Sequence, residues 1–392
     1  MSYEFSLADV AFLTSPAGVA AVAQVDRLAL TGASYLADVR TARGIVGDRA
    51  GAVLETVLLR RKAVSKVDDP GRWLLTDAAL QQATPMPVAR HRAERFAGRD
   101  VHDVTCSVGV DLAALAAVAA RCLGSDLDPV RLAMARHNCA AALVRADALR
   151  PVSRGTAVFA DPGRRDAAGR RRWRPSDFTP PLDALAEAYR GRDLAVKCAP
   201  GIDIPWAGEV ELVSLDGQVR EACLWSGSLA TAGRRATVLR TGGPAWTVTD
   251  AEPDDCPVRP PGQWIVDPDG AVVRAGLVRH YAARHGLGQL DERIAYLTGD
   301  TPPPGVRAFR VLEHGHYSEK ALRATLRRLG VGRLEILVRG LDIDPNTLRP
   351  RLKLGGPAEA TAVLTRVGHT PTAFVCAAVR IPANFPWSER PT

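Results

Sequence analysis

Apolar residues recur at three- and four-residue intervals through the first quarter of the chain, and glycine, proline and serine separate one run from the next. This spacing predicts short amphipathic helices, because residues three and four apart share one face of a helix. The expected helices cover residues 6–13, 19–30, 33–40, 52–62 and 76–82. No strand-like alternation of any length interrupts them. We therefore expect an N-terminal helical domain over residues 1–98.

From residue 99 the pattern changes to short apolar runs that alternate with helical segments. This order is typical of a doubly wound α/β fold with a parallel sheet. The first four runs each end at an acidic residue, and these are Asp103, Asp126, Asp147 and Asp161. The carboxyl ends of neighbouring parallel strands meet at one edge, where such folds bind ligands. We expect the four carboxylates to gather there.

Later runs predict one more helix and further core strands, at residues 182–190, 194–198, 210–215, 221–225 and 235–240. The core is therefore expected over residues 99–240. Residues 241–308 are rich in proline and glycine, and they are interpreted as a connecting subdomain that packs on the core because they contain Trp246, Trp264 and Tyr281. Strands at 264–266 and 271–274 and a helix at 277–284 are expected within it.

The last part of the chain, residues 309–392, predicts a compact α/β domain. Its expected elements are a strand, a helix capped by Ser318, a strand, a short helical turn near Pro345 and two strands joined by a turn at Gly368. The strands and the longer helix are expected at 309–313, 318–329, 333–339, 360–366 and 372–379.

The turn after the first core strand carries a motif, D-V-T-C-S-V-G at residues 103–109. It resembles the first motif of class I S-adenosylmethionine-dependent methyltransferases, with Thr105 and Ser107 where the family usually has glycine, and with Gly109 retained. The resemblance implies a seven-stranded Rossmann-like core and S-adenosyl-L-methionine as the cofactor, with its methionine part held by this turn. Small side chains at these positions still let the backbone approach a ligand.

A second motif, L-G-S-D-L-D at residues 123–128, matches the same family. Asp126 stands where members bind both ribose hydroxyls, and Asp147 stands where they bind the adenine amine. The cofactor-binding residues implied by the resemblance are Asp103, Thr105, Ser107, Gly109, Asp111, Asp126, Leu127, Asp147 and Ala148. Each aspartate taken alone is more typical of a helix cap or a turn, but four in this order, 23, 21 and 14 residues apart, favour cofactor binding. A Rossmann dehydrogenase would need G-x-G-x-x-G, and this turn has one glycine before Asp111.

The fourth core strand ends in D-P-G-R-R, residues 161–165. Methyltransferases of this class place the residues that face the acceptor atom there, so the resemblance implies that Asp161 and Pro162 are catalytic. Members that methylate amines commonly have a second proline and an aromatic residue, and here Gly163 and Arg164 replace them. The motif therefore does not favour methylation of the amine of an adenine or cytosine base, because no aromatic residue stands at this position to stack on the base.

An arginine-rich segment leaves this motif directly, at residues 164–174. Guanidinium groups with an aromatic ring among them suit phosphate contacts and base stacking. We expect the substrate to be bound by Arg164, Arg165, Arg170, Arg171, Arg172 and Trp173. The alternative is a solvated insertion in a chain whose positive charge is nearly all arginine.

Other chemistry-bearing residues have ordinary interpretations. Basic groups at 60–66 and 91–95 are more typical of solvated helix faces than of binding patches. Cys198 ends a core strand where some RNA enzymes attack a pyrimidine ring, but a buried structural thiol is favoured. His314 and His316 lack an apparent third ligand, so no metal is expected. The seven cysteines are odd in number and form no C-x-x-C pair, which argues against disulfides and a cysteine zinc site.

The net charge of +8 favours an anionic partner. The longest apolar helical run, residues 112–120, is shorter than the roughly 20 residues that span a bilayer. No signal-like segment opens the sequence. We therefore expect a cytoplasmic protein with no membrane partner.

The tail resembles the THUMP-like domain that follows a methyltransferase core in a family of bacterial proteins. The matching segments are residues 309–313, 320–323, 352–356 and 362–366. THUMP domains proper are RNA-binding modules of RNA-modifying enzymes, so the resemblance implies RNA as the partner. We expect a methyltransferase that acts on structured RNA, on a base of ribosomal or transfer RNA. A catalytically inactive RNA-binding protein and a small-molecule methyltransferase remain alternatives.

Overall fold

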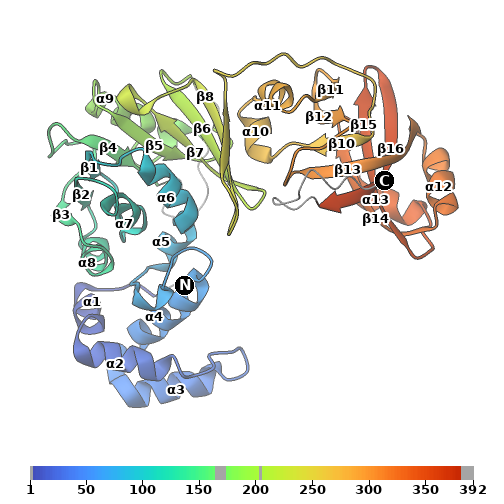
Figure 1. Ribbon diagram of the computed structural model, residues 1–392. Coiled ribbons are helices and arrows are strands. Elements are labelled where there is room, and N and C mark those ends of the chain that lie inside the picture. The colour runs from blue at the N-terminus through green and yellow to red at the C-terminus, as the bar shows by residue number, and fades with distance from the viewer. Residues whose placement is uncertain (1–2, 164–173, 203–204, 381–392) are drawn as a thin grey trace. The chain divides into compact units, whose positions relative to one another are not determined.

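The computed structural model describes residues 3–163, 174–202 and 205–380. Six α-helices open the described chain, at the blue end of Figure 1. They are α1 (Leu7–Leu13), α2 (Pro16–Val25), α3 (Tyr35–Val46), α4 (Ala50–Ala63), α5 (Asp77–Gln82) and α6 (Met86–Glu94). The five helices predicted for this region are present, but the second ends at Val25 instead of residue 30, and α6 is an additional helix. Ser6, Ser15 and Thr76 cap three of them by accepting a backbone N–H of the first turn.

A parallel sheet follows, and its strands alternate with helices as expected. The strands are β1 (Asp100–Asp103), β2 (Arg121–Asp126), β3 (Ala142–Arg145), β4 (Ala157–Ala160) and β5 (Leu194–Cys198). The helices are α7 (Val110–Ala116), α8 (Pro129–Asn138) and α9 (Leu182–Ala188). The spatial order β3-β2-β1-β4-β5 is that of a doubly wound fold.

Four more strands extend this sheet: β6 (Glu209–Leu215), β7 (Gln218–Trp225), β8 (Arg234–Leu239) and β9 (Trp246–Thr249). The full order is β3-β2-β1-β4-β5-β7-β6-β8-β9, nine strands within the described residues. The expected count of seven is therefore too small. The apolar runs themselves predict eight strands, one more than the resemblance implies. The ninth is β9, a short strand in the proline- and glycine-rich stretch after residue 240 that pairs antiparallel with β8.

A second sheet has seven strands within the described chain, in the order β11-β12-β10-β13-β16-β15-β14. They are β10 (Trp264–Asp267), β11 (Gly288–Asp291), β12 (Ile294–Gly299), β13 (Arg307–His316), β14 (Val331–Arg339), β15 (Ala358–Val367) and β16 (Thr370–Arg380). Its helices are α10 (Gly270–Arg274), α11 (Val278–Arg284), α12 (Glu319–Arg328) and α13 (Pro345–Arg351). Figure 1 draws this part of the chain from yellow to red.

Two expectations for residues 241–308 are corrected here. Residues 271–274 form helix α10 instead of a strand, because Asp269 caps it by accepting the Ala271 N–H at 2.8 Å. Strands β10, β11 and β12 belong to the same sheet as β13 to β16. The boundary expected at residue 308 therefore does not separate two sheets.

The chain divides into two compact units, Met1–Val210 with Arg220–Thr231 and Glu211–Val219 with Ala232–Thr392. In the first unit one apolar cluster runs from Val25 and Val53 on the N-terminal helices to Phe159 and Trp225 on the sheet. The helices and the parallel sheet thus share a core. In the second unit α12 and α13 cover one face of the seven-stranded sheet.

No single helix in the described residues is long and apolar enough to cross a membrane. Helices α1 and α2 would reach that length and apolarity only as a pair, which is bent by 81°.

Candidate active site

The four predicted carboxylates lie at the ends of four adjacent parallel strands. Asp103 ends β1, Asp126 ends β2, Asp147 lies two residues after β3, and Asp161 directly follows β4. All four line one cavity of about 740 Å³ in the first unit. The prediction that they gather at one sheet edge is confirmed.

The structure brings most of the other predicted residues to the same cavity. Its lining also includes Thr105, Ser107, Asp111, Leu127 and Ala148. Gly109 and Pro162 are outside the described lining. Gly109 instead precedes α7 with a left-handed backbone (φ 90°), and Pro162 is buried. Arg164, Arg165, Arg170, Arg171, Arg172 and Trp173 lie outside the described residues.

The turn after β1 is bonded to the end of β2 through Asp126. One carboxylate oxygen, Oδ2, accepts the Ser107 N–H at 3.0 Å, and Oδ1 accepts the Asp128 N–H at 2.9 Å. Ser107 has a left-handed backbone, with φ 50°, a conformation that favours glycine. The turn thus keeps the backbone shape of a glycine-rich loop although serine occupies the position.

Asp103 carries a buried acceptor atom that is not satisfied. Its Oδ1 accepts the Thr105 N–H at 3.1 Å, whereas its Oδ2 has no hydrogen-bond partner among the described residues. The side chain is 1% exposed. Burial raises the pKa of Asp103 well above its ordinary value, and the neighbouring Asp111 and Asp161 add to the rise. A positively charged ligand group at this atom would relieve the unsatisfied acceptor.

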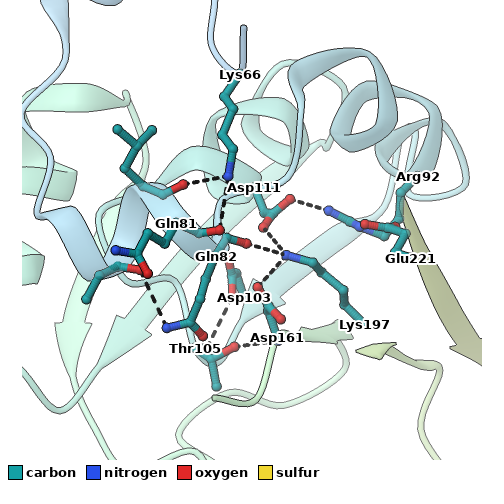
Figure 2. Close-up of polar contacts among 12 residues, drawn as sticks. Lys66, Gln81, Gln82, Arg92, Asp103, Thr105, Asp111, Asp161, Lys197 and Glu221 are labelled. Carbon is teal, nitrogen blue, oxygen red and sulfur yellow. Dashed lines mark hydrogen bonds and ion pairs between the residues drawn. The ribbon is translucent and has the colours of Figure 1, made fainter. Parts of the chain in front are cut away.

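A buried lysine, absent from the sequence-based predictions, holds Asp161. The Nζ atom of Lys197, on β5, lies 2.6 Å from Asp161 Oδ2 and 3.9 Å from Asp111 Oδ2, and it donates to the Gln82 carbonyl at 3.3 Å (Figure 2). Burial lowers the pKa of Lys197, but Asp161 and Asp111 outweigh it, so the pKa is raised overall. Thr105 Oγ1 accepts the Asp161 N–H at 2.6 Å, which fixes the backbone of the same residue.

A second buried cation, Arg92 of α6, continues this network away from the cavity. Its guanidinium donates to Asp111 and to Glu221 and lies 4.6 Å from the centre of the Phe159 ring. Burial lowers the pKa of Arg92, and Glu221 and Asp111 together raise it above its ordinary value. Four carboxyl groups, Asp103, Asp111, Asp161 and Glu221, therefore face two cations, which gives the network an excess of acid (Figure 2).

The expectation of solvated helix faces is therefore wrong for part of each basic group, whereas Arg61 and Lys62 are exposed. Arg92 is 2% exposed, and Arg95 pairs with Glu209 at 2.5 Å with its guanidinium 4.3 Å from the Trp225 ring centre. Arg60 donates to the Trp73 carbonyl at 2.9 Å, and Lys66 donates to the Leu80 carbonyl at 2.7 Å. These cations bind partners within the protein because neighbouring elements present carbonyls and carboxylates to them.

The remaining wall of the cavity comes from segments that carried no motif. Helix α5 contributes Ala79, Gln82 and Ala83, so the N-terminal helices help to enclose the site. Residues on either side of the arginine-rich segment also reach the wall. Gly163 and Thr179 both line the cavity and exchange two backbone hydrogen bonds, of 2.8 and 2.9 Å.

Other residues weighed in the sequence lie away from this chemistry. Cys198 is buried at the end of β5 and is not in the described cavity lining. His314 and His316 lie at the end of β13 in the second unit. In the described parts of the chain, no group of three or more His, Cys, Asp or Glu side chains is placed to hold a metal ion.

Comparison with known proteins identifies the family. The chain is 55% identical over 358 residues to proteins of two Mycobacterium tuberculosis strains, CDC 1551 and H37Rv, each named an uncharacterized S-adenosylmethionine-dependent methyltransferase. The match covers 85% of this chain and 99% of each relative. This chain belongs to the S-adenosylmethionine-dependent methyltransferases. The resemblance noted in its motifs is thereby confirmed.

Two further comparisons concern the fold of the chain and its terminal domains. A crystal structure described as a methyltransferase from Porphyromonas gingivalis W83 superposes with a TM-score of 0.72, covering 95% of this chain and 99% of that one, at 17% identity. Residues 306–378 match the family model described as THUMP domain-like, and residues 6–63 match a domain of unknown function. The predicted C-terminal THUMP-like domain is confirmed.

The cavity fits the cofactor of this methyltransferase family. S-adenosyl-L-methionine carries an ammonium, a sulfonium and a carboxylate group and is positively charged overall. The cavity presents an excess of carboxyl groups, with the unsatisfied Asp103 Oδ2 among them. A volume of about 740 Å³ lies within the usual range for small-molecule sites.

Proposed function

We propose that this methyltransferase transfers a methyl group from S-adenosyl-L-methionine to structured RNA. The observation that carries the substrate class is the THUMP domain-like match at residues 306–378, together with the net charge of +8. THUMP domains proper bind RNA in RNA-modifying enzymes, and a basic protein attracts polyanions.

The cofactor is proposed to lie along the four strand ends. Asp126 would accept hydrogen bonds from the ribose hydroxyls, since each of its oxygens accepts one backbone hydrogen bond among the described residues and retains further acceptor capacity. Asp147 would face the adenine amine, and the turn from Asp103 to Gly109 would hold the methionine part. In this arrangement the unsatisfied Oδ2 of Asp103 faces the ammonium group.

The bound cofactor supplies a methyl group activated by a positively charged sulfur. The protein's own task is to align the acceptor atom with that methyl group and to exclude water, which accounts for much of the rate enhancement in such reactions. Asp161 is suited to orient the acceptor because Lys197 and Thr105 fix its side chain and backbone. No general base is required by this proposal.

The arginine-rich segment is proposed to contact the phosphates of the RNA. Gly163 and Thr179, on either side of the segment, exchange backbone hydrogen bonds at the cavity wall, so both flanks of the segment lie on the acceptor side of the site. Arg174, the last arginine of the segment, is exposed. Trp173 would then offer a ring for base stacking.

Transfer of labelled methyl groups to bulk ribosomal RNA and bulk transfer RNA tests the proposal. The wild-type protein should label one of them, and Asp161→Asn should abolish labelling while it still binds the cofactor. Cofactor binding without transfer to either RNA would contradict the proposal and favour an inactive RNA-binding protein or a small-molecule methyltransferase. The latter predicts transfer to a small molecule that is insensitive to salt.

A further inference from the structure

A second hollow, of about 930 Å³, lies on the C-terminal unit between α12 and the loop that joins α13 to β15. Among the described residues that line it, none is acidic and five are basic. The five are Lys320, Arg323, Arg327, Arg328 and Lys353, and they define what we call the basic pocket.

The amphipathic pattern of α12 directs three of these cations toward the hollow. Lys320, Arg323 and Arg327 are three and four residues apart, so they share one face of the helix. Leu322 and Leu326 are buried in the core of the seven-stranded sheet, and Leu326 also forms part of the floor of the hollow. Packing of the apolar face thus fixes the direction of the basic face.

The positive charge of the basic pocket is largely uncompensated. Arg328 pairs with Glu313 at 2.5 Å, and the nearby Glu319 pairs with Arg351, outside the pocket, at 3.3 Å. The other four cations make no ion pair or side-chain hydrogen bond with any residue that the structure describes. Like charges around one hollow repel one another, and an anion placed there would relieve the repulsion.

The loop holds Lys353 at the pocket in a backbone conformation that lysine does not favour. Lys353 has a left-handed backbone, with φ 50°. The loop is fixed nearby because Gly356 packs on Gly330, where a Cβ atom would meet the Gly330 carbonyl oxygen at 2.2 Å. Glycine would suit the backbone of residue 353 better than lysine does.

We propose that the basic pocket binds backbone phosphates of the RNA substrate, an inference that rests on the proposed function. Lysine and arginine in an open hollow suit phosphates, which carry charge at every nucleotide. The described lining has no aromatic ring and no amide or hydroxyl side chain to distinguish bases. The basic pocket therefore positions RNA without reading its sequence.

The test compares two full-length triple variants with equal loss of charge. The pocket variant carries Lys320→Gln, Arg323→Gln and Arg327→Gln. The control carries Arg274→Gln, Arg293→Gln and Arg310→Gln, three arginines of the same unit that are not in the pocket lining. Binding of bulk transfer RNA and bulk ribosomal RNA is measured over a series of salt concentrations, and cofactor binding is measured by calorimetry.

The pocket variant should bind RNA roughly tenfold more weakly, with the logarithmic salt slope reduced by about 0.7–0.9 for each phosphate interaction that the substitutions remove. The control should keep the wild-type slope, and both should bind the cofactor normally. A further variant, Lys353→Gly, distinguishes a loss of RNA binding from a loss of folding stability. It should weaken RNA binding and leave the melting temperature unchanged or higher, because glycine favours this backbone.

Each other result overturns a distinct part of the inference. If wild type binds RNA and the pocket variant keeps its slope, or if the control loses as much, the basic pocket is not the phosphate site and the proposed function stands. If wild type binds cofactor but neither binds nor methylates RNA, the proposed function fails, and the pocket inference fails with it. If poly-glutamate binds as tightly as RNA and the pocket variant loses both, the pocket is a site for acidic protein.

Discussion

Arg92 of the first unit lies 2% exposed between two carboxylates, whereas Arg327 of the second unit stands exposed in the basic pocket with no acidic partner among the described residues. A buried charge is strongly unfavourable unless it is paired, so the folded state requires the acidic partners of Arg92. An exposed arginine needs no partner, and its charge remains available to a ligand.

The sign of the excess charge differs between the two regions. Around the cavity, carboxyl groups outnumber cations, and the Asp103 Oδ2 atom remains without a described partner. Around the basic pocket, cations outnumber carboxyl groups. The cavity suits a cofactor that carries positive charge, and the basic pocket suits an anionic substrate. The net charge of +8 describes neither region, since local pairing decides which charges are available.

The largest difference in stability between the two regions is expected when one arginine is removed from each. Arg92→Met removes the guanidinium that pairs with the buried Glu221 and leaves Asp111 with the more distant Lys197. It should lower the free energy of unfolding by about 3–5 kcal/mol. Arg323→Gln should change it by no more than about 0.5 kcal/mol. Unfolding in denaturant, followed by circular dichroism, measures both.

Arg90→Met is the matched control on the same helix. Arg90 is exposed and pairs with Asp68, also exposed, so its removal should cost about 0–1 kcal/mol. Equal losses for Arg90→Met and Arg92→Met would contradict the distinction between buried and exposed pairs.

Asp126→Ala should have the next largest effect, on the cofactor. If its carboxylate binds the ribose, the loss should be about 1.5–3 kcal/mol of binding free energy, as for hydrogen bonds to a charged group. Part of that loss would come from the turn, because Asp126 also accepts the Ser107 and Asp128 N–H groups.

Asp128→Ala provides the comparison for that effect. It removes the cap of α8 and should lower stability by about 1 kcal/mol, but it leaves the proposed ribose acceptor in place. Calorimetric titration with equal affinity in wild type and Asp126→Ala would remove Asp126 from the cofactor site.

The strand order and the four acidic strand ends could be predicted because each depends on local pattern and on the geometry of parallel strands. Lys197 could not be assigned, because its partner Asp161 lies 36 residues earlier and only strand pairing brings them together. A signal was present, since a lysine inside an apolar strand is unfavourable without an acid on a neighbouring strand. Helix α12 was predictable from its periodicity. The position of Lys353 beside α12 was not, because it depends on how the loop between α13 and β15 folds against that helix.

Cofactor affinity should depend on pH through Asp103. Burial, with Asp111 and Asp161, raises the pKa of this carboxyl, while Arg92 and the Thr105 N–H act in the opposite direction. A cofactor ammonium favours the ionised form. Affinity should therefore rise as pH increases from the ordinary aspartate pKa through the raised value, by at most about tenfold per pH unit, and then level off.

Titration calorimetry between about pH 4 and 7 measures this dependence, below the range where the cofactor's own amine titrates. Asp103→Asn is neutral throughout and should give weaker binding with a flat profile. A profile of Asp103→Asn that matches the wild type would assign the pH dependence to another group.

The smallest effect is expected from the left-handed residue that each region contains, Ser107 in the cavity and Lys353 in the basic pocket, both with φ 50°. Glycine removes roughly 1–2 kcal/mol of backbone strain at such a position, but its unfolded chain gains roughly 0.5–1 kcal/mol of entropy. Ser107→Gly should therefore stabilise the protein by about 0.5–1 kcal/mol, and Ser107→Ala should not. Thermal unfolding measures the change. A Ser107→Gly variant less stable than wild type would mean that the serine side chain stabilises the turn by more than the backbone strain it imposes.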